Sequence, residues 1–279
     1  MKRVYFPAAL LLAGALLLAG CGALSGGKNE NSAAANTATP DKNGPAAAGA
    51  APKQTRQVLR DYRKPDDAPV QKFPAAETRA VVKYLFGDGA DPNIELTSRV
   101  AGAFTKPEAK ETLYFITGCN DEETKRFTTD CPHVAWNSAG WIAIYDGQTP
   151  VLKISEALGG GIVKVADLDG DGVSEILSEG GYMGQGIMTT SLNVGHIVDG
   201  KYKQIENFRG YVSDCDATPE PDDKHFAKAA VISYLPTTDG RKPEFSEEFY
   251  EIKCTEENAK TAWKKITKKD FDAYFDANS

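Results

Sequence analysis

Residues 162–177 read IVKVADLDGDGVSEIL, and this stretch indicates both a fold class and a chemical site. Its two ends are β-branched and alternate in character, which is typical of strands. The nine residues between them carry four carboxylates, from Asp167, Asp169, Asp171 and Glu175. Carboxylates this close in the chain repel one another unless a cation lies among them, and oxygen ligands of this kind suit Ca²⁺. The stretch therefore predicts a calcium loop at 167–175 between two strands.

The spacing within the loop distinguishes it from an EF-hand. Counting Asp167 as position 1 places Gly172 at position 6, where a loop that wraps an ion turns sharply and glycine reaches positive φ without a steric penalty. Val173 follows at position 7, where the backbone carbonyl is the expected ligand. An EF-hand requires a bidentate glutamate at position 12, whereas this sequence has Ser178 there. We therefore expect a strand–loop–strand setting with Glu175 as the last ligand.

This nine-residue pattern, with a strand on either side, resembles the FG-GAP/VCBS type of calcium loop found in β-propeller repeats. The resemblance rests on residues 165–172 (VADLDGDG) followed by Glu175 and Ile176. It implies that Ca²⁺ is bound by Asp167, Asp169, Asp171, the carbonyl of Val173 and Glu175. Glutamate stands at position 9 where aspartate is commoner in the family, and one copy of the loop is found in the sequence. The alternatives are an acidic turn without an ion, or a cation that serves only as a structural staple.

The first 51 residues have the composition of an export signal followed by a tether. Residues 1–20 combine a basic start, an apolar run over 4–18 and a small-residue cleavage site, which together predict a secretory signal peptide. The sequence Leu-Ala-Gly-Cys at 18–21 resembles a bacterial lipobox, which implies cleavage before Cys21 and a lipid anchor on that residue. Gly22 is similar to the residue that follows the cysteine in outer-membrane lipoproteins. The alternative is an ordinary signal peptide with an incidental cysteine. Residues 21–51 are rich in Ala, Gly, Asn and Ser, so we expect a flexible tether there.

The charge balance of the chain bears on its partners. The formal charge is −7, and removal of residues 1–20 leaves 30 basic and 39 acidic residues, a charge of −9. Nucleic acid and anionic lipid are bound through clustered Lys and Arg, so this balance argues against nucleic acid as a partner.

Four cysteines remain once Cys21 carries lipid, and an even number in an exported chain suggests disulfides. Three pairings are open. We favour Cys119–Cys131 and Cys215–Cys254, because each pair brackets a local excursion of the chain. No C-x-x-C spacing occurs, which argues against zinc.

Residues 52–279 are expected to form one mainly β domain of antiparallel sheets, either partly propeller-like or a β-sandwich. Asp-Gly pairs at 146–147, 199–200 and 239–240 lie between apolar alternations and predict hairpins. Short helices are predicted at 77–86 and 263–275, where apolar residues recur at helical spacing. The strands expected outside the loop region cover 94–104, 112–116, 141–145, 151–154, 189–198, 202–208, 229–235 and 248–254.

No nucleophile elbow, glycine-rich phosphate loop or histidine pair with metal spacing occurs in the sequence, so it gives no catalytic motif. The glycine-rich stretch 180–186 places Tyr182, Met183 and Gln185 directly after the loop, as a ligand-contact loop or as a flexible hairpin connection. We predict a non-catalytic, calcium-binding cell-envelope lipoprotein, anchored to the outer membrane, whose β-domain binds an envelope protein or glycan. The alternatives are an exported hydrolase with a structural calcium ion and an inhibitor-like regulatory domain.

Overall fold

Two antiparallel sheets and two helices make up the computed structural model, which describes residues 54–64, 71–121, 123–131, 139–155, 160–217, 224–238, 240–256 and 262–277. All of these residues belong to one compact unit, Pro52–Ser279. The predicted signal peptide, Cys21 and the tether lie outside the described residues. Within the described part, neither helix is long and apolar enough to cross a membrane.

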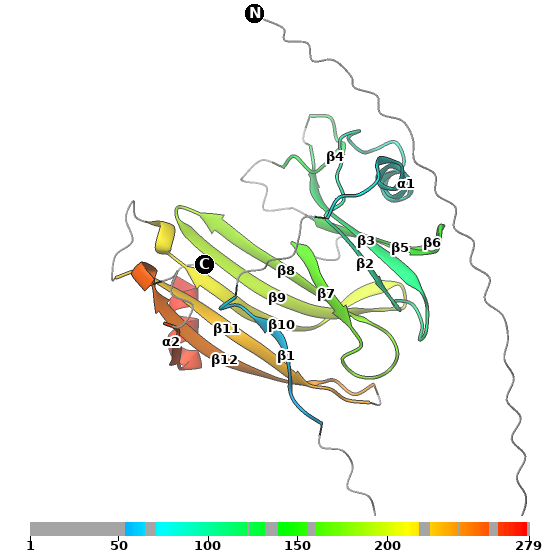
Figure 1. Cartoon of the computed structure of the whole chain (residues 1–279). Coiled ribbons are helices and arrows are strands. Elements are labelled where there is room, and N and C mark those ends of the chain that lie inside the picture. The colour runs from blue at the N-terminus through cyan, green and yellow to red at the C-terminus, as the bar shows by residue number, and fades with distance from the viewer. Residues whose placement is uncertain are drawn as a thin grey trace, which may run out of the picture. The chain divides into compact units, whose positions relative to one another are not determined.

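The larger sheet has eight strands and curls into a half-barrel (Figure 1). Seven strands follow the order β13-β12-β11-β10-β9-β8-β7, and β1 pairs with β11. Two strands share one edge of β11. Strand β10 pairs with residues 227–229 of β11, and β1 pairs with residues 231–234. The strands are β1 (Gln57–Asp61), β7 (Gly161–Ala166), β8 (Glu175–Gly184), β9 (Ile187–Val198), β10 (Lys201–Ser213), β11 (Phe226–Leu235), β12 (Glu244–Lys253) and β13 (Lys264–Ile266).

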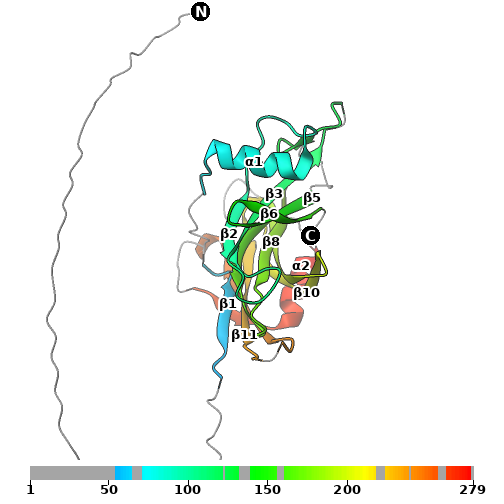
Figure 2. The ribbon, with the colours of Figure 1, turned by 90° about the vertical axis from the view of Figure 1, so that its right-hand side faces the viewer.

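The smaller sheet has the order β2-β3-β5-β6, with β4 paired to one end of β3. Its strands are β2 (Ser98–Gly102), β3 (Glu111–Asn120), β4 (Phe127–Thr128), β5 (Ala139–Asp146) and β6 (Thr149–Ile154). Helix α1 (Ala75–Phe86) lies across one face of this sheet (Figure 2). Val81 and Leu85 of α1 pack there against Tyr114 and Ile116.

Side chains alternate across β3, so the sheet is covered on both faces. Leu113 and Phe115 point away from α1 and pack with Ile162 of β7 and Ile176 of β8, which flank the predicted calcium loop. The two sheets therefore share a core next to that loop. The half-barrel has a separate core, which helix α2 (Lys268–Ala277) closes by burying Phe271 and Phe275.

The mainly β, antiparallel fold class is confirmed, and its form is a half-barrel with a second sheet. Two predicted hairpins are present, β5–β6 at Asp146-Gly147 and β9–β10 at Asp199-Gly200. In the second, φ is +52° at Asp199 and +72° at Gly200, as a type I′ turn requires. Asp239 lies outside the described residues, whereas Gly240 has φ +71° between β11 and β12.

The second helix begins later than predicted. Residues 264–266 form strand β13 on the edge of the half-barrel, and the helix starts at Lys268. The reason is a capping arrangement at the boundary: the Asp270 amide donates to Thr267 Oγ1 (3.2 Å), and the Thr267 hydroxyl donates to Asp270 Oδ2 (2.6 Å). The helical spacing of Trp263 and Ile266 instead reflects packing against the half-barrel core. A further strand, β1, occupies a polar segment for which no strand was predicted.

Both favoured disulfides are present. Cys119 bonds to Cys131, with 5.8 Å between their Cα atoms, and Cys215 bonds to Cys254, with 5.3 Å. The first links the end of β3 to the segment after β4, and the second links the segments that follow β10 and β12.

Candidate metal centre

The predicted calcium loop lies between two paired strands, as the sequence suggested. Ala166 at the end of β7 pairs with Glu175 at the start of β8, so residues 167–174 form a loop closed at its base by the sheet. Leu168 is fully buried in the half-barrel core and fixes the start of the loop. The strand–loop–strand setting is therefore confirmed.

Three acidic side chains of the loop converge. One carboxylate oxygen from each of Asp167, Asp169 and Glu175 lies within 4.8 Å of the other two. Asp167 is exposed, Asp169 is 6% exposed and Glu175 is completely buried. The group thus extends from the surface into the interior, and its oxygen atoms are hard ligands of the type that Ca²⁺ and Mg²⁺ prefer.

Glu175 is the decisive member of this group. Its Oε2 accepts a hydrogen bond from the Leu168 amide (2.6 Å), whereas its Oε1 is buried and has no hydrogen-bond partner. Burial raises the pKa of Glu175 to about 7, the Leu168 amide lowers it, and the charges of Asp169, Asp171 and Asp167 raise it. A buried, unpartnered oxygen next to two other carboxylates is an arrangement that a cation would stabilise.

Asp169 is subject to the same effects in weaker form. Burial raises its pKa, a hydrogen bond from the Asp171 amide opposes this, and the carboxylates of Asp171 and Asp167 raise it further. A proton and a cation would therefore compete for the same oxygen atoms.

The backbone of the loop is folded around its own carboxylates. Asp167 accepts hydrogen bonds from the amides of Gly170 (2.7 Å) and Gly172 (3.1 Å), and Asp169 Oδ1 accepts one from the Asp171 amide (3.1 Å). Gly172 has φ +86°, which confirms the predicted turn at position 6, and Gly170 has φ +72°. These bonds fix the side chains of Asp167 and Asp169 relative to the backbone of the loop.

The structure brings together three of the five predicted ligands. Asp171 is exposed and lies outside the converging group, and its Oδ1 accepts a hydrogen bond from the Val173 amide (2.7 Å). Ligation by Asp171 and by the Val173 carbonyl stays a prediction. The orphaned oxygen of Glu175 has no counterpart in the sequence pattern, because it results from burial by distant segments.

The other predicted contact residues, Tyr182, Met183 and Gln185, lie at the far end of β8. Strands β8 and β9 pair as far as Gly184 and Ile187, and the turn consists of Gln185 and Gly186, with φ +54° and +78°. The stretch is therefore a tight hairpin rather than an open loop. Met183 is 79% exposed and Tyr182 is 41% exposed at its tip.

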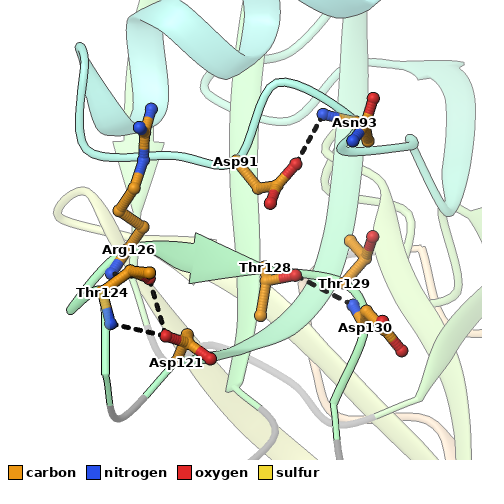
Figure 3. A pocket seen from close by; sticks show the side chains of 8 residues that line it. All are labelled: Asp91, Asn93, Asp121, Thr124, Arg126, Thr128, Thr129 and Asp130. Carbon is orange, nitrogen blue, oxygen red and sulfur yellow. Dashed lines mark hydrogen bonds between the residues drawn. The ribbon is translucent and has the colours of Figure 1, made fainter.

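A polar cavity of about 280 Å³ lies away from the loop, between the segment after α1 and the β3–β4 hairpin (Figure 3). Arg126 joins its two walls by donating to the carbonyls of Ala90 (Nε, 3.0 Å) and Asp88 (Nη2, 3.3 Å). Hydrogen bonds from Thr124 lower the pKa of Asp121. The cavity contains none of the predicted site residues and is lined by Asp91, Asn93, Asp121, Thr124, Arg126, Thr128, Thr129 and Asp130.

Comparisons with protein-family models, curated proteins and solved structures give no match to the chain. The functional assignment therefore depends on the geometry of the metal loop.

Proposed function

We propose that this chain is a calcium-binding protein and that the cation is held by Asp167, Asp169 and Glu175. The observation that carries the proposal is Glu175 Oε1, which is buried without a partner among converging carboxylates. Leaving a buried acceptor unpaired costs about 1–3 kcal/mol, and more if it is charged. A bound cation removes this cost and the repulsion between the carboxylates together.

A proton is the simplest competitor for the role of the cation. Protonation of Glu175 removes its charge and the unpaired acceptor at Oε1, but a single proton leaves the charges of Asp167 and Asp169 next to each other. A divalent cation contacts all three carboxylates at once, so it satisfies the site more completely than a proton does. Calcium is favoured over Mg²⁺ because the loop supplies several ligands of its own, whereas Mg²⁺ usually keeps several waters.

The biological setting that we propose is the cell envelope. The lipobox supports a lipid anchor on Cys21, in the outer membrane, with residues 21–51 as the tether of the β-domain. Replacing Cys21 with Ser is expected to move the protein from the detergent phase to the aqueous phase in a partitioning assay. Unchanged partitioning of Cys21→Ser would contradict the anchor.

We infer that the domain acts by binding an envelope protein or glycan rather than by catalysis. The carboxylates of the metal loop support a structural role, because the amides of the loop itself engage Asp167 and Asp169. The cation would then shape a surface rather than activate a substrate.

The direct test is thermal unfolding of residues 52–279, which form one compact unit, in EDTA and with increasing Ca²⁺ or Mg²⁺. Calcium at ten times its Kd is expected to add about 1.4 kcal/mol to the free energy of unfolding by mass action. Asp169→Asn keeps the acceptor for the Asp171 amide but removes a charge, so it should abolish this increment. Asp88→Asn changes an exposed carboxylate outside the loop and should retain it.

Two outcomes would contradict the assignment. An increment that persists in Asp169→Asn would place the cation elsewhere. If the stabilisation reached its midpoint at equal concentrations of Mg²⁺ and Ca²⁺, the loop would still be a cation site, but it would not be selective for calcium.

A further inference from the structure

The candidate metal loop is held from two sides by segments of the two different sheets. On the side of the smaller sheet, the Ser174 amide donates to the carbonyl of Ala103 (2.6 Å), and the Ala103 amide donates to Ser174 Oγ (3.3 Å). Ala103 begins the turn that joins β2 to β3. This reciprocal pair is a direct link from the residue before Glu175 to the smaller sheet.

On the other side, the segment between β11 and β12 of the half-barrel contacts the loop. The Gly240 amide donates to the carbonyl of Asp169 (3.0 Å), and the Thr237 hydroxyl lies between that carbonyl (3.1 Å) and the carbonyl of Arg241. Asp169 thus supplies a carboxylate to the metal group and a carbonyl to the half-barrel. Any shift of its backbone would change both interactions together.

The backbone of the loop also lies very close to the two segments that contact it. A Cβ atom at Gly170 would lie 2.6 Å from Cα of Thr238, and one at Gly172 would lie 2.9 Å from Cβ of Pro107. Neither position therefore has room for a side chain, and both have positive φ. One conformation of the loop satisfies both neighbours.

The β2–β3 turn is itself firmly attached to the smaller sheet. Glu111, at the start of β3, is 4% exposed and accepts hydrogen bonds from the amides of Phe104 (2.7 Å) and Thr105 (3.0 Å). Phe104 is fully buried in the core that the two sheets share. A change in this turn therefore reaches the packing between the sheets.

We infer that cation binding in the loop regulates the attachment of the two sheets to each other, through the β2–β3 turn on one side and the β11–β12 segment on the other. This inference rests on the proposed metal function. Without a cation, the three carboxylates repel one another and the loop moves away from one or both neighbours. With a cation, the loop takes the conformation that both neighbours fit, so the ion fastens one sheet to the other.

Hydrogen exchange of the intact protein, in EDTA and in saturating Ca²⁺, tests this directly. The amides of Ser174 and Gly240, which bond across the two contacts, should exchange about tenfold or more slowly when calcium is bound. Amides of Val81 and Leu85 in α1, which packs on the opposite face of the smaller sheet, serve as the internal control and should not change. Calcium binding that slows only residues 167–173 would overturn the inference and leave the proposed metal function intact.

A variant tests the same coupling from the other direction, because coupling between two sites is reciprocal. Ser174→Ala removes the hydroxyl that receives the Ala103 amide and should raise the Kd for Ca²⁺ about threefold or more. Ser191→Ala, in β9, is the matched control and should not alter the Kd. Unchanged affinity of Ser174→Ala overturns the inference, whereas absence of calcium binding to the unaltered protein overturns the proposed function itself.

Discussion

Two nine-residue loops of this domain end in the same hydrogen-bonded arrangement of a buried glutamate, but they differ in how the oxygen atoms of that glutamate are paired. Residues 103–111 lead from β2 into β3, and residues 167–175 lead from β7 into β8. Each ends in a buried glutamate that is the first residue of the next strand, Glu111 or Glu175. Each glutamate accepts a hydrogen bond from the amide seven residues before it.

Other positions of the two loops also correspond. The second residue of each, Phe104 or Leu168, is fully buried. The sixth residue of each has positive φ, +60° at Glu108 and +86° at Gly172. The two loops thus share a backbone plan although their sequences, AFTKPEAKE and DLDGDGVSE, have little in common.

The third position of each loop explains why we propose an ion for only one of them. In the first loop the Thr105 hydroxyl donates to Glu111 Oε1, so both oxygens of that glutamate are paired. In the second loop Asp169 stands at this position, and a carboxylate has no hydrogen to donate to Glu175 Oε1. One loop is completed by its own chain, whereas the other places acceptor against acceptor, and this difference is why we propose a cation for it.

The largest expected difference in the free energy of unfolding is between substitutions of the two glutamates. Glu111→Ala leaves two amides and a hydroxyl without their acceptor and should lower the free energy of unfolding by about 3–5 kcal/mol. The loss should be at least as large in Ca²⁺ as in EDTA, because the turn that Glu111 holds also contacts the candidate metal loop. Urea unfolding under both conditions measures it, and a loss below about 1 kcal/mol would contradict the role given to Glu111.

In metal-free protein, Glu175→Gln is expected to raise the free energy of unfolding rather than lower it. Because the pKa of Glu175 is raised from 4.5 to about 7, its stabilising contribution is fully present below pH 4.5 and is lost as pH rises through 7. In EDTA at pH 8, Glu175→Gln should therefore be more stable than the unaltered protein, on the order of 1–3 kcal/mol.

The pH profile supplies the control for this second experiment. Unaltered protein in EDTA should lose stability between pH 4.5 and pH 7 relative to Glu175→Gln, and saturating Ca²⁺ should reverse the order of the two proteins. If the stability of the two proteins in EDTA changed in parallel with pH, Glu175 would not be the group whose ionisation destabilises the loop.

The smallest expected changes in the free energy of unfolding concern the sixth residue of each loop. Glu108 has positive φ, which disfavours a residue with a side chain, so Glu108→Gly should stabilise the protein by about 0.5–1 kcal/mol. Gly172→Ala should destabilise it by about 1 kcal/mol or more, because an added Cβ also meets Pro107. Thermal unfolding of the two variants compares them, and effects of the same sign would argue against a shared backbone plan.

Sequence patterns were sufficient for what depends on neighbouring residues. The alternation around 162–177, the Asp-Gly hairpins and the turn at Gly172 all follow from local rules, and the structure contains them. Short excursions of the chain also favoured the correct disulfides. The predicted start of helix α2 is too early, because apolar spacing does not detect the Thr267–Asp270 cap, whose residues are present in the sequence.

What depends on distant contacts was not predictable. Glu175 is fully buried, with one oxygen unpaired, at a place where its chain neighbours Leu168 and Ile176 enter two different cores that distant segments complete. The loop at 103–111 carries no calcium pattern in its sequence, because Ala103, Thr105 and Pro107 stand where that pattern has aspartates. Its likeness to the loop at 167–175 lies in hydrogen bonds and dihedral angles, which residue identities do not reveal.

The disulfide between Cys215 and Cys254 has a consequence for covalent connectivity. It closes a ring that contains all of β11 and β12, which lie between β10 and the edge strand β13 of the half-barrel. A ring of this length restricts the unfolded chain, with a stabilising effect on the order of 4 kcal/mol. A single cut anywhere inside the ring leaves the two fragments joined until the bond is reduced. Strand β11, which holds β1 and with it the beginning of the domain, therefore stays covalently attached after such a cut.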